Sequence, residues 1–288
     1  MSDARILDRG YRRYEGERRG APGAVASLAR QSALRALGLR RTFWAKVFPL
    51  LSAFIAYLPA TVFVGIAALF PDELLDPDAV IPSYGEYYGF ITAAIVVFVA
   101  LVGPEVLCPD RRDGMLGLYL ASPLTRDTYL LAKALAVVPV LAIVTVGPPL
   151  LLLVGRTFAD AGPETVGAFA SILLRIVLSG LAISAAYTAI SLAAASLTDR
   201  RAVASAAVIL LLLVSSVATT VLQELGVDDR ILLLNLFLLP FELVQRIYGE
   251  LGVEPGIATW ELVAANVAWT VAAAGLVRER YRRLQVTR

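Results

Sequence analysis

The sequence has 288 residues, of which 58% are hydrophobic and 17% are charged, and its mean hydropathy is +0.72. A soluble domain carries about 25% charged residues, so the composition argues against a soluble globular domain and indicates a membrane protein. Histidine is absent and cysteine occurs once, at Cys108. Histidine-based catalysis, histidine metal ligands and an internal disulfide are therefore excluded. The net charge of +2 says little about binding partners, because basic and acidic segments alternate along the chain.

The N-terminal part, residues 1–46, is predicted to be a cytoplasmic tail followed by an amphipathic surface helix. Residues 23–46 combine apolar with basic side chains in a loosely helical pattern. The apolar positions are Val25, Leu28, Ala29, Ala33, Ala36 and Leu37, and the basic ones are Arg30, Arg35, Arg40 and Arg41. A helix of this kind lies in the plane of the membrane surface.

Six later stretches are long and apolar enough to cross a bilayer, whose hydrocarbon core of about 30 Å needs about 20 helical residues. They are residues 47–70, 90–108, 129–154, 168–197, 202–222 and 260–277. Helices are expected because every backbone amide must be paired inside the lipid. Residues 47–277 are thus a transmembrane domain of an all-α membrane protein, and residues 278–288 form a basic cytoplasmic tail. Pro139, Pro148 and Pro149 predict a kink in the third span.

Basic residues are distributed unevenly among the connections. The N-terminal segment, the second and fourth loops and the C-terminal tail contain clusters of arginine, whereas the first loop contains only acidic charges, at Asp72, Glu73, Asp76, Asp78 and Glu86. Cytoplasmic loops carry an excess of Lys and Arg. Both termini and the even-numbered loops are therefore expected in the cytoplasm, and the chain is expected in the cell membrane as a multi-pass protein.

A further apolar stretch, residues 231–251, is not counted as a span. Pro240 interrupts it, and Glu242 and Arg246 lie four residues apart, as a pair on one face of a helix. A seventh span would also place the arginine-rich tail outside. We predict a re-entrant or interfacial hairpin on the outer side, before the sixth span.

Charged residues inside spans are costly and mark candidate functional sites. Arg175 in the fourth span either extends to the outer membrane surface or belongs to a substrate path. Glu261, beside Trp260, is expected to anchor the last span at the interface. Glu105, near the cytoplasmic end of the second span, either anchors the N-terminal surface helix or the short helix of the following loop electrostatically, or is a plain helix-end residue.

The loop after the second span is predicted to contain a short helix. Pro109 is expected to end the span, Asp110 to cap a new helix, and Asp113 to lie in its first turn, where the helix dipole favours an anion. Ser122-Pro123 ends this helix, because a residue before proline is disfavoured in the helical region.

Arg111 and Arg112 are expected to point from this short helix into the cytosol. Thr125 or Asp127 then starts the third span. Two interpretations of the helix remain open at this point: it either rests on lipid or docks into a partner protein.

The loop combines an acidic residue, a charged-Arg-Gly cluster, a segment with leucines and a proline, and a lysine at the start of the third helix. The residues are Glu105, Asp110, Arg111, Arg112, Asp113, Gly114, Leu116, Tyr119, Leu120, Ser122, Pro123, Leu124, Arg126, Tyr129 and Lys133. This pattern resembles the first cytoplasmic loop of type-2 ATP-binding cassette (ABC) permeases.

The resemblance covers nearly the whole chain. The N-terminal surface helix resembles the family's elbow helix, the six spans match its core, and residues 231–251 resemble its short outer helices. Residues 14–18 resemble the N-terminal run of actinobacterial members. The resemblance implies that the loop is a coupling helix seated in a separate ATPase subunit.

An ATPase interface follows as an implication of the resemblance. It comprises Glu105, Asp110, Arg111, Arg112, Asp113, Gly114, Leu116 and Tyr119, with Thr198, Asp199, Arg200 and Arg201 of the fourth loop. The sequence has no GxxxxGK[ST] phosphate-binding loop. This absence fits the expectation that the partner subunit binds ATP and Mg²⁺. The chain itself is expected to bind no cofactor or metal and not to be an enzyme. A second permease copy or paralogue completes the dimer, membrane lipids surround it, and nucleic acid is not a partner.

The expected function is that of the permease subunit of an ATP-driven transporter, exporting an amphipathic, lipid-like or drug-like compound. One alternative is a non-transporting membrane subunit that transmits ATPase motion, which the short outer loops disfavour. Another is a lipid-modifying membrane enzyme. The absence of histidine and of a nucleophile motif argues against that enzyme.

Overall fold

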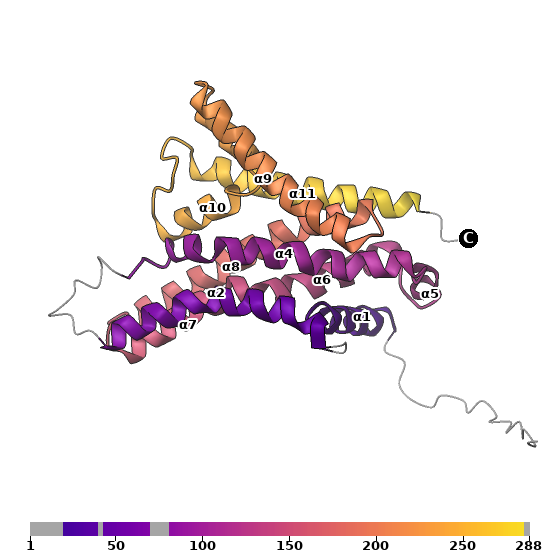
Figure 1. The fold of residues 1–288 in the computed structure, drawn as a ribbon, viewed down its shortest axis with the longest axis horizontal. Helices are drawn as coiled ribbons and strands as arrows, with labels where there is room; N and C mark the ends of the chain where they lie inside the picture. The colour runs from indigo at the N-terminus through magenta and orange to yellow at the C-terminus, as the bar shows by residue number, and fades with distance from the viewer. Residues whose placement is uncertain (1–19, 40–42, 70–80, 285–288) are drawn as a thin grey trace, which may run out of the picture.

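The computed structural model describes residues 20–39, 43–69 and 81–284, and every regular element within these ranges is helical (Figure 1). The elements are α1 (Gly20–Ala36), α2 (Phe43–Leu69), α4 (Tyr87–Arg112), α5 (Leu116–Leu120), α6 (Arg126–Thr145), α7 (Gly147–Phe158), α8 (Val166–Leu197), α9 (Arg201–Glu224), the 3₁₀ helix η1 (Asp229–Leu234), α10 (Leu239–Tyr248) and α11 (Thr259–Arg283). Residues 14–18, Arg40, Arg41 and the acidic positions from Asp72 to Asp78 lie outside the described residues.

The prediction of six spans is confirmed. Within the described ranges, six helical segments are long and apolar enough to cross a membrane: Lys46–Leu69, Tyr87–Arg112, Arg126–Phe158, Val166–Leu197, Arg201–Glu224 and Thr259–Arg283. Five of them are single helices, and the third is the pair α6 and α7. Their ends differ from the predicted ends by a few residues, because helices extend beyond the apolar run into the polar surface region.

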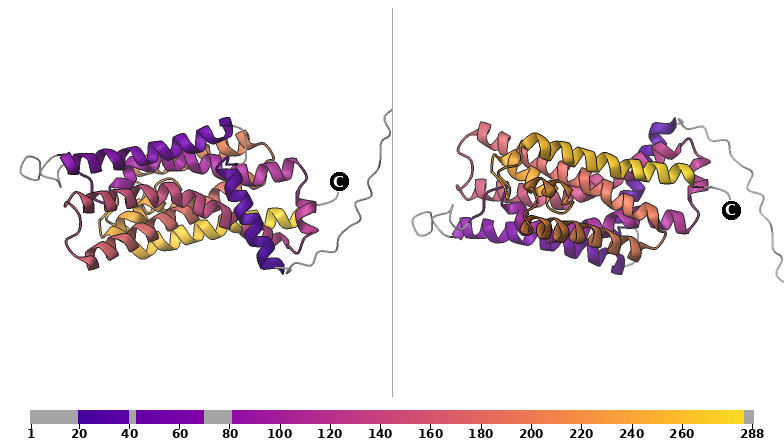
Figure 2. Two further views of the ribbon diagram at one scale, coloured as in Figure 1. Left: turned by 90° about the horizontal axis from the view of Figure 1, so that it is seen from below. Right: turned by 90° about the horizontal axis from the view of Figure 1, so that it is seen from above.

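The N-terminal helix α1 is shorter than predicted. It ends at Ala36, and Lys46 belongs to α2 rather than to the surface helix. One side of α1 is buried against α6 and α4 through Leu28, Ser32 and Ala36, and Figure 2 shows the helix running across the other helices at one end of the bundle. The helix therefore rests on protein along its inner face.

Helices α4 and α8 form the centre of the bundle. They approach closely at Gly103, where an added Cβ would overlap the side chain of Ser191. The Ser191 hydroxyl donates to the carbonyl of Val99 at 2.9 Å. Small residues at a helix crossing let the two backbones approach closely. The resulting van der Waals contacts hold the helices together, because the hydrophobic effect does not drive helix association within lipid.

The third span is interrupted, as its prolines predict. It changes from α6 to α7 at Val146, just before Pro148 and Pro149, and Pro139 lies inside α6. The Thr145 hydroxyl donates to the carbonyl of Gly180 in α8 at 3.0 Å. The interruption is therefore held by a neighbouring helix, which is the usual way that a broken helix is stabilised within a membrane.

The predicted break at Pro109 is wrong. Helix α4 continues through Pro104 and Pro109 to Arg112, and Asp113 is its C-terminal cap. Consequently Asp110 caps no new helix and Asp113 does not lie in the first turn of one. Proline is tolerated here because the surrounding helices bury this part of α4 from Val106 to Asp110.

Residues 231–251 form two short helices instead of a span. The 3₁₀ helix η1 and α10 are joined by an irregular turn that begins at Asn235, and Pro240 lies in the first turn of α10. The Tyr187 hydroxyl and the Trp269 indole donate to carbonyls of this segment, at Phe237 and Leu233. An irregular backbone that is buried in protein and hydrogen-bonded by side chains is compatible with a re-entrant hairpin.

The predicted pairing of Glu242 with Arg246 is absent from the described contacts. The Glu242 carboxylate instead accepts from the backbone amide of Val253 at 3.0 Å. The Arg246 guanidinium donates to the carbonyls of Glu254 and Ile257. Both charges thus hold the loop between α10 and α11.

Candidate functional site

The loop between α4 and α6 lies at one end of the bundle, together with α1 and the C-terminal end of α11 (Figure 1). It leaves α4 through a turn centred on Gly114, whose φ is +64°. The Met115 amide donates to the Asp110 carbonyl at 2.9 Å and the Gly114 amide donates to the Arg111 carbonyl at 3.3 Å. This is a Schellman motif, which needs a left-handed residue after the helix and favours glycine there.

The short helix α5 is anchored on its inner side and open on its outer side. Leu116 and Leu124 are buried in the core, whereas the side chain of Leu118 is 65% exposed. Arg112, Asp113 and Gly114 are exposed as well. Thr125 caps α6 by accepting from the Thr128 amide, so the predicted start of the third span at Thr125 is confirmed. The loop is thus anchored on its inner side and exposed on its outer side.

A buried ion cluster lies directly behind this turn. We call it the Asp110 cluster; it consists of Asp110, Lys133, Arg35 and Tyr129. Asp110 Oδ2 lies 2.6 Å from Lys133 Nζ, and both side chains are 1% exposed. Arg35 Nη2 lies 2.6 Å from Asp110 Oδ1, and the Tyr129 hydroxyl donates to Asp110 Oδ2 at 3.0 Å. One carboxylate therefore joins α1, α4 and α6.

The surroundings of the Asp110 cluster complete its hydrogen bonds. Lys133 Nζ also donates to Ser32 Oγ of α1 at 2.9 Å, and it lies 5.3 Å from the ring centre of Tyr129, which adds a cation–π contact. The Tyr129 ring stacks on Tyr281 of α11 at 5.8 Å. The cluster thereby also reaches the last span.

Arg35 is the member of the cluster that opens toward the surface. Burial acts to lower its pKa, but the charge of Asp110 and the hydrogen bond to Asp110 outweigh burial, so the pKa lies above its ordinary value. The guanidinium is charged at every physiological pH. The cluster therefore holds two cations against one carboxylate.

Asp110 is a buried positioning residue, contrary to its prediction as a surface contact. Its carboxylate is enclosed by the cluster, and Leu116 beside it packs into the core. Tyr119 is half-buried, with its ring 5.7 Å from that of Tyr129. Of the predicted interface residues in this loop, Arg112, Asp113 and Gly114 remain on the surface.

Arg111 does not point into the cytosol as predicted. Its Nη1 donates to the carbonyls of Ser196 and, at 3.2 Å, Thr198, at the C-terminal end of α8. The last carbonyls of a helix have no partner within the helix and attract a cation. Arg111 therefore fixes the end of α8 to the end of α4.

Replacing Arg111 with alanine is expected to loosen the turn between α8 and α9. Hydrogen bonds from a charged donor contribute about 1.5–3 kcal/mol, so we expect a lower thermal unfolding midpoint and faster amide exchange around residues 196–200. Arg112→Ala is the matched control, since Arg112 is exposed and its ion pair is with adjacent Asp113. Equal effects of the two substitutions on unfolding would contradict the role given to Arg111.

The turn between α8 and α9 lies beside the end of α4. Arg201 of α9 forms an ion pair with Glu105 of α4. This ion pair joins two spans, whereas the predicted anchoring was to the N-terminal surface helix or the short loop helix. The Arg200 amide donates to the Thr198 hydroxyl at 3.2 Å, whereas the Arg200 side chain is exposed. Asp199 is likewise near the surface of this turn and lines a cavity together with Arg200.

The two charges near the other end of the bundle have structural contacts. Arg175 Nη1 donates to the carbonyl of Tyr248 at the C-terminal end of α10, at 3.0 Å. Glu261 Oε2 accepts from the Ala258 amide at the start of α11, and Glu261 Oε1 accepts from Arg230 Nε at 3.1 Å. Arg175 thus holds α10 against α8, and this contact supports a structural role.

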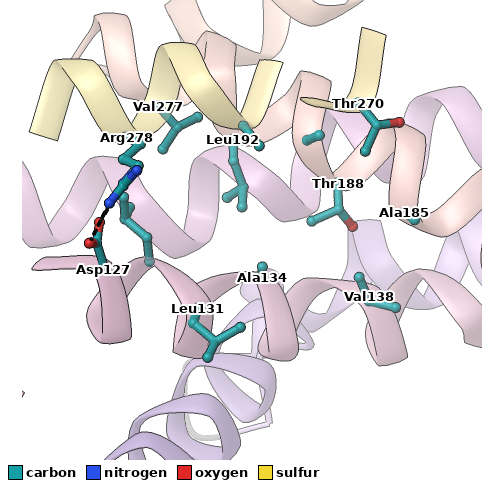
Figure 3. A pocket seen from close by; sticks show the side chains of 13 residues that line it. Asp127, Leu131, Ala134, Val138, Ala185, Thr188, Leu192, Thr270, Val277 and Arg278 are labelled. Carbon is teal, nitrogen blue, oxygen red and sulfur yellow. Dashed lines mark hydrogen bonds and ion pairs between the residues drawn. The ribbon is translucent and has the colours of Figure 1, made fainter. Parts of the chain in front are cut away.

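An apolar groove runs between α6, α8 and α11 and has a volume of about 540 Å³ (Figure 3). Ala134, Ala185 and Leu192 line it, with Thr188 and Thr270 as its polar groups. A bidentate ion pair between Asp127 and Arg278, with both N···O distances 2.9 Å, lies at one end of the groove. The groove has the size and the lining of a site for an apolar ligand.

Sequence reasoning missed two features of this site. Lys133 was read only as part of the loop pattern, although a lysine inside an apolar span requires a buried counter-charge and therefore signals a partner. Leu118 is the second, because a leucine on the outer face of a charged loop is a candidate contact. Arg35 carried no signal that set it apart from the other arginines of its helix.

The sequence matches a protein-family model. The family model described as "ABC-2 family transporter protein" matches residues 17–285, which is nearly the whole chain. No curated protein matches the sequence.

Proposed function

The chain belongs to the ABC-2 family of transporter proteins, and from this premise we propose that it is the permease subunit of an ATP-driven exporter. Its six spans make it a multi-pass membrane protein. The proposal places it in the cell membrane with both termini in the cytoplasm, on the basis of the arginine distribution. The end that carries α1 and α5 then faces the cytoplasm.

We infer that α5 and the turn before it dock onto a separate ABC ATP-binding subunit. The observation that carries this inference is the combination of an exposed turn with the buried Asp110 cluster behind it. The contact surface consists of Arg112, Asp113, Gly114 and Leu118. ATP and Mg²⁺ are held by the partner subunit.

The Asp110 cluster gives this docking surface a physical link to the spans. A turn that moved alone would transmit nothing, because a conformational change is driven only by contacts that differ between two states. Here Asp110 joins the turn to α1 and α6, and Tyr129 contacts α11. Displacement of α5 by the ATPase is therefore passed on as a rigid-body movement of several helices.

The apolar groove of Figure 3 supports an amphipathic or lipid-like cargo. Thr188 and Thr270 are its polar groups along the spans, and the charges of Asp127 and Arg278 lie at one end. An ion or a sugar would require more polar groups to replace its hydration. A second copy of the permease or a paralogue completes the transport pathway.

The test is reconstitution with the candidate ATP-binding subunit in inside-out vesicles. ATP-dependent uptake of a fluorescent amphipathic compound is expected, with no uptake when ATP is replaced by a non-hydrolysable analogue. ATP hydrolysis without movement of any tested amphiphile would instead support a non-transporting subunit that transmits ATPase motion. Turnover of a lipid by the chain alone would support a lipid-modifying enzyme.

A further inference from the structure

A second cavity, distinct from the apolar groove, opens between the ends of α2, α4 and α9, next to α1. Its volume is about 740 Å³, within the range of about 300–1,000 Å³ that is typical of ligand sites. Four arginines lie on its wall: Arg35, Arg112, Arg200 and Arg201. Two acidic residues, Glu105 and Asp199, accompany them, so the lining carries an excess of positive charge.

The arginines keep unused hydrogen-bond donors. Arg35 Nε is buried and has no hydrogen-bond partner in the part of the chain that the structure describes. The Arg200 guanidinium forms no ion pair with any described residue. Arg201 uses Nη1 for Glu105 and Arg112 uses Nε for Asp113, which leaves the other N–H groups of both forks available to an anion.

The rest of the cavity wall is apolar. Phe48 and Pro49 of α2, Leu101 of α4 and Ala202 of α9 line it, and all four belong to segments able to span a membrane. An acidic side chain of a soluble partner would contact the arginines and leave the apolar part of the wall without a ligand. A molecule with an anionic head and apolar chains would contact both parts of the wall.

Arginine forks bind phosphate and carboxylate alike through two parallel N–H bonds, and a phospholipid joins such a phosphate to the apolar chains that the rest of the wall favours. The N-terminus of α9 adds to the attraction, since Arg200 at its cap position provides no side-chain cap for the first amides. We propose that this cavity binds the phosphate headgroup of an anionic phospholipid, whose acyl chains lie along the apolar surfaces of α2 and α9. The lipid would belong to the cytoplasmic leaflet. This assignment rests on the orientation given under the proposed function.

The site would place a lipid between Arg35 of α1 and the turn before α9, next to the docking surface. Arg112 belongs both to the cavity wall and to the docking surface. An anionic lipid in the cavity would therefore set the position of Arg112 relative to the ATPase. Anionic lipid then acts as a structural ligand of the permease end that receives the ATPase.

The test is a lipid titration of the full chain in detergent, without any ATPase, followed by native mass spectrometry. The probes are dioleoylphosphatidylglycerol, dioleoylphosphatidylcholine and inorganic phosphate. We expect the anionic lipid to bind more tightly than the zwitterionic one. Arg200→Gln is expected to weaken the anionic lipid about fivefold, the contribution of one basic residue near an anionic membrane surface.

Arg280→Gln is the matched control, because Arg280 is an exposed arginine at the same end of the molecule and does not line the cavity. It is expected to leave the affinity unchanged. The proposal is overturned if the two lipids bind equally, if both variants behave alike, or if inorganic phosphate alone binds as tightly as the lipid. Unchanged anionic-lipid affinity of Arg200→Gln in the titration, together with a loss of ATPase binding in a separate co-purification, would assign the cavity to the ATPase instead. Because the titration contains no ATPase, a failed ATPase proposal does not affect its result.

Discussion

Replacing Asp110 with alanine is expected to destabilise the chain more than any other single substitution at this end of the bundle. It would leave the ammonium of Lys133, which is 1% exposed, without its counter-charge. Removing one partner of a buried ion pair costs about 3–5 kcal/mol, because the remaining charge stays desolvated. We expect loss of folded, monodisperse protein or a steep fall in the unfolding midpoint.

Lys133→Met is expected to cost less than Asp110→Ala, since Arg35 continues to neutralise Asp110 after the lysine is removed. The double variant Asp110→Ala/Lys133→Met is expected to recover part of the stability lost in Asp110→Ala, because the fully buried ammonium is then gone and the charge left without Asp110 is Arg35, whose side chain is 31% exposed. Unfolding in detergent, followed by circular dichroism, measures all three.

Asp113→Ala is the control for this series. Asp113 is three residues further along, at the C-terminal cap of the same helix. Its side chain is 51% exposed, and its ion pair with Arg112 is on the surface. Exposed ion pairs contribute about 0–1 kcal/mol, so the control is expected to be nearly neutral. An Asp110→Ala variant as stable as Asp113→Ala would show that the cluster does not hold the turn.

The second large effect is expected on ATPase association. Replacing Leu118 with glutamate should leave the fold intact, because the side chain is 65% exposed. If this leucine is buried by the ATPase, its loss removes about 1.5–3 kcal/mol of apolar burial, which corresponds to about tenfold to hundredfold weaker binding. Co-purification of the complex and its ATPase rate would both fall.

Leu251→Glu provides the comparison for Leu118→Glu. Leu251 is 66% exposed and lies in the loop between α10 and α11, toward the other end of the bundle. Its substitution is expected to leave ATPase binding unchanged. An equal loss of ATPase binding in both variants would indicate a general effect of added charge and not a docking contact.

The spans were predictable from the sequence because lipid imposes a simple requirement of length and apolar composition. The interruption of the third span followed from Pro148 and Pro149 for a local reason, whereas Pro139 lies inside α6 without ending it. The short helices of residues 231–251 were predictable from Pro240 and from the count of spans. In each case the deciding information lay within the segment itself.

The site was less predictable because tertiary contacts decide it. Pro109 was expected to break α4, yet the helix continues because neighbouring helices bury it. That continuation turns Asp110 inward, where its partners Arg35 and Lys133 come from α1 and α6. Arg111 became the cap of α8 for the same reason. Lys133 signals a buried counter-charge, but nothing within residues 104–133 identifies Asp110 as that partner or shows the contacts with Arg35 and with the end of α8.

Cross-linking through a single cysteine tests the docking of α5 most directly. The native Cys108 is fully buried, so Leu118→Cys introduces one accessible thiol for a photoactivatable reagent. In the reconstituted complex we expect a cross-link from position 118 to the ATP-binding subunit and none from Leu251→Cys. No cross-link from position 118, or equal cross-linking from both positions, would contradict the account that the ATPase docks on α5.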